Sequence, residues 1–164
     1  MSREAPVWLR IGSFAVGLLF LVVPLPAPLD ALRPYLLALA VAYWALESPG
    51  QGGMAIAWVV GLLADVVSGT LLGEQALRLA VLFYLVQRFR AQLRFFPLWQ
   101  QSAAVGLLLL NDLALMTSIR LIAGAGWPSI GVALSPLVGL LAWPWWFLLL
   151  DALRLRHRER LGGR

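Results

Sequence analysis

The sequence predicts an all-α protein that crosses a membrane six times and forms a single domain. Of its 164 residues, 61% are hydrophobic and 13% are charged, and the mean hydropathy is +0.83. Soluble domains carry about twice that share of charged residues, roughly 25%. Six spans of roughly 20 residues would use nearly the whole length. We therefore expect one transmembrane domain over residues 1–164, with a short cytoplasmic N-terminal segment (1–7) and a basic cytoplasmic tail (152–164).

The composition also includes few of the side chains that enzymes most often use for catalysis. The chain has no cysteine, which excludes disulfides, thiol catalysis and thiolate metal sites, and its single histidine, His157, lies in the basic tail. No Ser/His/Asp set is apparent. We expect no catalysis, no metal and no cofactor. All 13 basic residues are arginine, and because they lie beside apolar runs they indicate a membrane surface and not nucleic acid.

Turn residues divide the apolar stretches into helices, taken here in chain order. Pro24, Pro26 and Pro28 end the first; the run Pro49-Gly50-Gln51-Gly52-Gly53 separates the second from the third; and Ser68-Gly69-Thr70 offers a tight turn before the fourth. Uncharged stretches at 95–111 and 121–150 supply the last two. The expected helices are residues 8–26, 34–48, 54–68, 71–87, 99–122 and 131–150. The first run follows arginines, as a secretory signal does, but prolines and further spans come after it, so we interpret it as an anchor.

The arginines give the orientation. With six spans and an inward N-terminus, ten of the thirteen face the cytoplasm, as the positive-inside rule requires. These ten are Arg3, Arg10, Arg88, Arg90, Arg94, Arg154, Arg156, Arg158, Arg160 and Arg164. The other three, Arg33, Arg78 and Arg120, fall in the outer half of their spans. We expect a multi-pass membrane protein with both termini cytoplasmic, whose arginine clusters contact anionic lipid.

Asp65, Glu74, Arg78 and Asp112 are ionisable residues inside the expected spans that need a partner or a water-filled cavity. Each costs about 2.5–3.5 kcal/mol at the centre of a membrane helix unless it is paired or faces water. Glu74 and Arg78 have the i,i+4 spacing of an ion pair. We hypothesise that all four converge on one polar pocket in the outer half of the membrane. The alternative is a set of separate local salt bridges.

Two further patterns have both a structural and a functional interpretation. Gly61, Gly69 and Gly73 follow a four-residue spacing with Asp65, which is typical of closely packed membrane helices but frequent by chance. In the last span, Trp143, Pro144, Trp145 and Trp146 suit a bent docking surface for another membrane protein, because proline can kink a helix. An interfacial aromatic belt would have the same residues.

The segment GLLADVVSGTLLG at 61–73, followed by ALRLAVLFYLVQ, resembles the signature stretch of the MreD family, small rod shape-determining membrane proteins of bacteria. RPYLLALAVAYWALESP at 33–49, LWQQ at 98–101, Asp112, and WPWWFLLLDALR at 143–154 add to the resemblance, which covers nearly the whole chain in order. It implies a six-helix, non-catalytic subunit of the machinery that elongates the cell wall. MreC is the first partner implied, beside MreB and RodA with its transpeptidase. A fold similar to the substrate-binding component of energy-coupling-factor transporters, with an outward-facing pocket, is also implied.

Two functions of different kinds follow. The first is a scaffold that maintains rod shape by binding and positioning partners such as MreC, favoured by short expected connections on the outer face. The alternative is a small-molecule capture or carrier subunit of a transporter, favoured by the outer-half charges.

Overall fold

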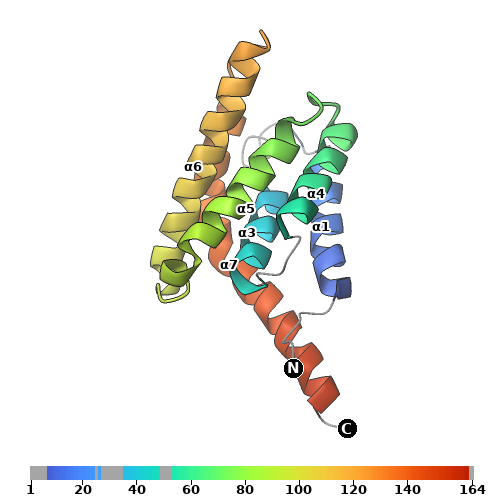
Figure 1. Cartoon of the computed structure of the whole chain (residues 1–164), viewed down its shortest axis with the longest axis vertical. Helices are drawn as coiled ribbons and strands as arrows, with labels where there is room; N and C mark the ends of the chain where they lie inside the picture. Colours follow the sequence, from blue (N-terminus) through green and yellow to red (C-terminus); the bar gives the residue numbers. More distant parts are fainter. Residues whose placement is uncertain (1–6, 25, 27–34, 49–52, 163–164) are drawn as a thin grey trace.

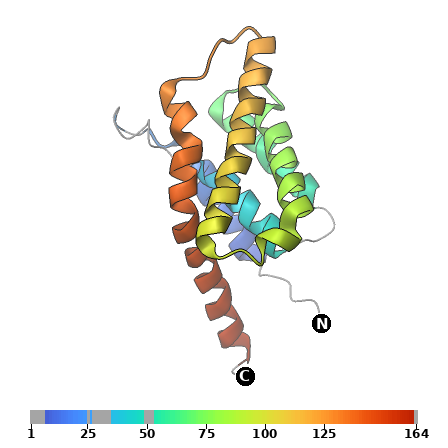
Figure 2. The same cartoon turned by 90° about the vertical axis from the view of Figure 1, so that its left-hand side faces the viewer.

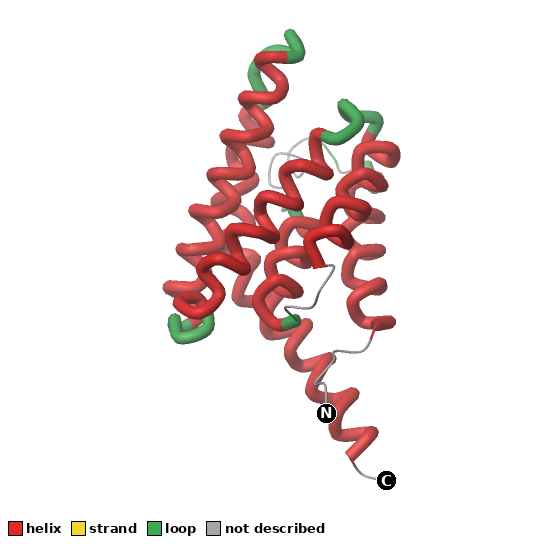
Figure 3. The backbone as a smooth tube through the Cα atoms, viewed as in Figure 1, coloured by secondary structure: helices red, strands yellow, loops and turns green. Residues whose placement is uncertain are grey.

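Six helices make up almost all of the structure, a computed structural model that describes residues 7–24, 26, 35–48 and 53–162, the last five by their backbone only. The helices are α1 (Val7–Val22), α3 (Leu36–Glu47), α4 (Gly53–Ser68), α5 (Glu74–Leu93), α6 (Leu98–Ile122) and α7 (Ile130–Gly162). The described residues contain no strand (Figure 3). The all-α prediction is therefore confirmed.

Four helix boundaries differ from the sequence prediction by three residues or more. Helix α1 ends at Val22 and not at residue 26, because the residue before Pro24 is disfavoured in the helical conformation. Helix α5 begins at Glu74 and not at residue 71, since Gly73 has a left-handed φ of 94°. It also continues to Leu93, and α7 continues to Gly162 and not to residue 150. Arginine and leucine are strong helix formers, which explains both extensions.

Helix α3 is the centre of the bundle. All of its residues from Leu37 to Leu46 are buried, and it packs against α1, α5 and α7 (Figure 1). A helix that is apolar on every side is stable only when other helices surround it. Its 12 residues make a rise of about 18 Å. The remaining helices are therefore arranged around a short buried rod.

Successive helices run in opposite directions, which gives the bundle two distinct ends (Figures 1 and 2). The beginning of α1, the α5–α6 turn and the C-terminal half of α7 lie at one end. We call this the arginine-rich end, after Arg10, Arg90, Arg94 and Arg154. The α4–α5 turn and the α6–α7 connection lie at the other, which we call the distal end. The last part of α7 projects beyond the arginine-rich end (Figure 2).

Two arginine side chains bind groups at the C-terminal end of α3, where backbone carbonyls lack helical partners. The Nε atom of Arg90 donates to the Leu46 carbonyl at 2.6 Å, and Arg154 forms an ion pair with Glu47. Positive charge is also favoured near this end of a helix dipole. Arg90 and Arg154 therefore have partners inside the chain, in addition to any contact of the arginine clusters with lipid.

Two of the helices, α6 and the Ile130–His157 part of α7, are long and apolar enough to cross a membrane. Helices α1, α3 and α4 are apolar but shorter, with 16, 12 and 16 residues. The hydrocarbon core of a bilayer is about 30 Å thick, so helices of this length match it only where the bilayer is thinned or where they are buried in protein.

The aromatic cluster of α7 is divided between core and surface. Trp143 is fully buried, and its Nε1 donates to Oε1 of Gln101 at 3.1 Å. The indole of Trp145 is 79% exposed. Of the residues expected to form one docking surface, Trp143 belongs to the core, while Trp145 faces outward. Because Trp143 and Trp145 are two positions apart, helical periodicity sends them to different sides.

The three glycines of the expected packing motif also have different roles. A Cβ on Gly61 would lie 2.3 Å from the Cα of Ala76, so this glycine lets α4 and α5 come into close contact. Gly69 and Gly73 lie in the turn between these helices, with φ of 64° and 94°, and a Cβ on either would meet nothing within 4 Å. They allow the turn conformation and do not pack between helices.

Gly61→Ala should lower the free energy of unfolding by about 1–3 kcal/mol, because the new methyl group overlaps backbone atoms that cannot move independently. The matched control is Gly12→Ala on α1, where a Cβ meets nothing within 4 Å. Thermal unfolding of the purified chain in detergent would measure both. Equal midpoints for the two variants would contradict the close approach of α4 and α5.

Candidate functional site

Asp65 completes the N-terminus of the neighbouring helix α5. Its Oδ1 accepts hydrogen bonds from the Gln75 backbone N–H at 2.8 Å and from the Thr70 hydroxyl at 3.0 Å. Its Oδ2 accepts from the backbone N–H of Gly73 at 2.8 Å and of Ala76 at 3.4 Å. A carboxylate is favoured here, since it satisfies unpaired N–H groups and complements the helix dipole. The buried charge of Asp65 is therefore stabilised by backbone.

Arg78 and Asp112 form a buried ion pair that joins α5 to α6. Arg78 donates from Nε to Oδ1 of Asp112 at 3.0 Å and from Nη2 to Oδ2. Such two-bond pairs are stronger and more directional than single hydrogen bonds. The side chains are only 8% and 5% exposed. The guanidinium also lies over the ring of Tyr35, 5.3 Å from its centroid, so it contacts the residue that precedes α3.

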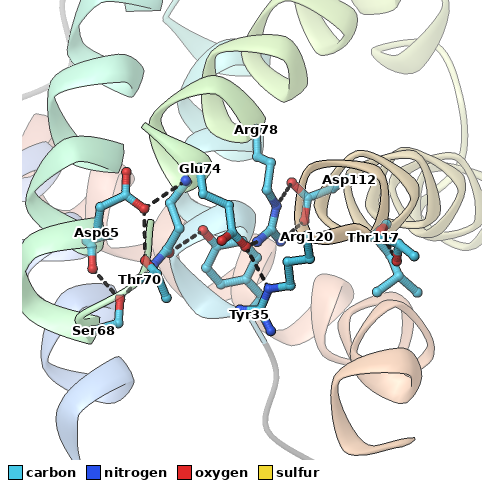
Figure 4. A network of polar contacts seen from close by, with 12 residues as sticks. Tyr35, Asp65, Ser68, Thr70, Glu74, Arg78, Asp112, Thr117 and Arg120 are labelled. Carbon is cyan, nitrogen blue, oxygen red and sulfur yellow. Dashed lines mark hydrogen bonds and ion pairs between the residues drawn. The ribbon is translucent and has the colours of Figure 1, made fainter. Parts of the chain in front are cut away.

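Glu74 connects this pair to a second arginine. Its Oε1 lies 3.7 Å from Nη1 of Arg78, which is the i,i+4 contact expected from the spacing. The same oxygen accepts a hydrogen bond from Nε of Arg120 at 3.1 Å. The result is a row of four charged groups in the order Asp112, Arg78, Glu74 and Arg120 (Figure 4). Two are acidic and two are basic, so their formal charges cancel.

A cavity of about 260 Å³ adjoins this row of charges at the distal end. Residues of α1, α4, α5, α6 and α7 line it, together with the residue before α3 and one in the turn after α4. They are Leu21, Tyr35, Ser68, Thr70, Glu74, Gln75, Arg78, Met116, Arg120, Gly131, Val132 and Ser135. Of the four residues expected at one pocket, Glu74 and Arg78 line the cavity. Asp65 and Asp112 do not line it. They lie behind it and hold residues that do, because Asp65 binds Thr70 and Asp112 binds Arg78.

Gln75 arranges the polar side of the cavity. Its Oε1 accepts a hydrogen bond from the Tyr35 hydroxyl at 2.8 Å, and its Nε2 donates to Oγ of Ser68 at 2.6 Å. This amide therefore connects the residue before α3 to the last residue of α4. Most of the polar side chains in the wall are thus held in fixed positions before any ligand is bound.

Sequence reasoning did not place Tyr35, Gln75 or Arg120 at this site. One signal was present, because Asp112, Met116 and Arg120 are spaced by four and so fall on neighbouring positions of one helix side. Met116 and Arg120 both line the cavity. Nothing in the local pattern indicates Tyr35, which reaches the site only because α3 is packed between α1 and α5.

The chemistry available at the cavity is that of a binding site for a polar ligand. Its wall combines carboxylate, guanidinium, hydroxyl and amide groups with the apolar side chains of Leu21, Met116 and Val132. In the part of the chain that the structure describes, no group of three or more His, Cys, Asp or Glu side chains could hold a metal ion.

Comparison with known proteins identifies the family. The family model for the rod shape-determining protein MreD matches residues 2–153. This chain belongs to the MreD family. The rod shape-determining protein MreD of Haemophilus influenzae (strain ATCC 51907 / DSM 11121 / KW20 / Rd) is 28% identical over 148 residues, which cover 90% of this chain and 91% of that protein. The resemblance noted in the sequence is confirmed, and a role in cell shape follows from it.

No solved structure matches the chain significantly. The likeness to the substrate-binding component of energy-coupling-factor transporters therefore stays a prediction.

A double-mutant cycle would test the pairing within the charged row. Arg78→Met and Asp112→Leu should each lower the free energy of unfolding by about 3–5 kcal/mol, because each leaves a buried charge without its partner. The double variant should be more stable than either single variant, since it removes both charges. Denaturant unfolding in detergent would give the three values. Arg88→Met, at an exposed position of α5, is the control, and a double variant with the summed loss of the two single variants would contradict the pairing.

Proposed function

We propose that this MreD protein is a non-catalytic integral membrane subunit of the cell-wall elongation complex, which maintains rod shape by binding and positioning partner proteins. Family membership over residues 2–153 is the observation that carries this proposal. MreC is the first partner, beside MreB and RodA with its transpeptidase. The turn at 69–73 and the connection at 123–129 are short, so neither could reach the cell wall. These two connections support a role outside the membrane that is exerted through partners with larger domains.

The proposed arrangement has all six helices crossing the bacterial inner membrane, with both termini in the cytoplasm. The alternating helix directions support it, because they bring the beginning of α1 and the end of α7 to the same end of the bundle (Figure 1). That end also carries Arg88 and Arg94, both exposed, as expected for a cytoplasmic side. Exposed arginines near the membrane surface attract anionic lipid headgroups, at about 1 kcal/mol each.

The exposed side of α6 and α7 is the surface that we assign to partner binding. Leu107, Leu141 and Trp145 are each at least two-thirds exposed, at 67%, 70% and 79%. Lipid tails would cover such residues equally well, so apolar character alone does not favour a protein partner. If a partner binds here, we expect Trp145 to contribute most, because tryptophan is enriched among the residues that contribute most to binding energy at protein interfaces.

A capture or carrier subunit of a transporter is the second candidate. The cavity beside Glu74 and Arg120 supports it, because mixed polar and apolar walls are typical of small-molecule sites. A carrier would also require an energising partner, which a scaffold would not.

Depletion in the native bacterium separates these two functions. Rods should widen and become round as the protein is lost, and vitamins in the medium should not restore their shape, because a scaffold supplies no nutrient. Microscopy of cell width with and without supplements is the measurement. Re-expression of the chain from a plasmid is the control and should restore rods. Normal width, with growth that fails only in the absence of a supplement, would replace the scaffold by the carrier.

A further inference from the structure

The distal cavity selects its ligand first by charge. The four charges in the row from Asp112 to Arg120 cancel within the chain. A ligand with a net charge would add an unpaired charge to a site whose side chains are largely buried, which is costly in a low-dielectric environment. A zwitterion adds none. The ligand favoured by this site therefore carries one positive and one negative group.

Unused hydrogen-bonding atoms show where the two groups would lie. Arg120 bonds to Glu74 through Nε only, and in the described part of the chain its two terminal nitrogens have no recorded partner. Its side chain is 27% exposed. Arg78, in contrast, has all three nitrogens in contact with Asp112 or Glu74. An anion would therefore bind at Arg120 and not at Arg78, with the planar two-donor geometry that arginine offers to phosphate.

Glu74 provides the matching acceptor. Both arginines contact its Oε1, and within the described residues no hydrogen bond to its Oε2 is recorded. Glu74 lines the cavity next to Arg120, so an ammonium group at Oε2 would lie beside an anion at Arg120. The N-terminus of α5 offers no competing anion site, because the carboxylate of Asp65 already occupies its N–H groups.

We propose that the distal cavity binds a phosphoethanolamine group, with the phosphate on Arg120 and the ammonium on Glu74. The apolar side chains of Leu21, Met116 and Val132 also line the cavity and would contact whatever the phosphate is esterified to. Two sources share this chemistry: the headgroup of a zwitterionic phospholipid, and soluble glycerophosphoethanolamine, a phosphodiester with the same net charge of zero. The proposal is independent of the scaffold function, because a scaffold can hold partners with or without a ligand in this cavity.

The test is a titration of the purified full-length chain in detergent, followed by native mass spectrometry and calorimetry. The probes are dihexanoyl phosphatidylethanolamine, dihexanoyl phosphatidylglycerol, which has a net negative charge, and glycerophosphoethanolamine, which is soluble and has no net charge. We expect saturable binding of the ethanolamine lipid, with the glycerol lipid about tenfold weaker or worse, because its charge is not balanced.

Two variants and one control test the location. Arg120→Gln removes the phosphate contact, and Val132→Phe fills the cavity without a change of charge. Each should weaken binding of the ethanolamine lipid by about tenfold or more, the usual scale for a lost charged contact or a blocked pocket. Arg156→Gln removes the same charge from an exposed position of α7 and should leave binding unchanged. If Arg120→Gln fails to fold, Val132→Phe alone gives the answer.

The outcomes distinguish the two sources and can overturn the proposal. Competition by glycerophosphoethanolamine at an affinity close to that of the lipid would support the proposal with a soluble source, and weak competition would support it with a lipid source. Equal binding of the two lipids, absence of saturable binding, or unchanged binding in a folded Arg120→Gln or Val132→Phe variant would overturn it.

Discussion

The buried pair of Arg78 and Asp112 is the interaction on which the distal half of the bundle depends. It joins α5 to α6 through two hydrogen bonds, and the same guanidinium contacts Tyr35 and Glu74. A lone charge at this depth would cost several kcal/mol in lipid or in an apolar core. Each of these contacts therefore has to be kept for the others to be stable. Arg78 and Glu74 both line the cavity. Their contacts with Asp112 and with each other therefore also fix this part of the cavity wall.

The two ends of the molecule use charge in different ways. At the distal end, acidic and basic side chains neutralise one another around a cavity. At the arginine-rich end, Arg90 and Arg154 satisfy the C-terminal end of α3, while Arg88 and Arg94 stay exposed. Helix α3 connects the two ends, since Tyr35 precedes it and Glu47 ends it. Side chains of other helices contact the residues at both of its ends, since Gln75 and Arg78 contact Tyr35 and Arg154 pairs with Glu47. The chain belongs to the MreD family, so this arrangement of helices serves a role in cell shape.

Sequence patterns predicted what depends on neighbours along the chain. Proline and glycine located the helix breaks to within a few residues, and the spacing of Glu74 and Arg78 predicted their contact. Contacts between distant segments could not be predicted in this way. Arg120 bonds to Glu74 across 46 positions, and the burial of Trp143 depends on Gln101 in another helix. Helix ends also depend on conformation: Gly73 delays the start of α5 because its backbone is left-handed. Predicting the cavity would have required the packing of α1, α5, α6 and α7 as well.

The proposed arrangement has six membrane crossings, which place the two ends of the bundle on opposite sides of the membrane. The chain has no cysteine, so single cysteines can be introduced and labelled with an impermeant maleimide on intact spheroplasts. Ala125→Cys, in the connection after α6, should react before lysis, and Phe95→Cys, in the turn before α6, only after lysis. Both residues are exposed, so differences in burial do not confound the comparison. Reaction of both cysteines from the same side would contradict the crossing of α6, and with it the proposed six-span arrangement.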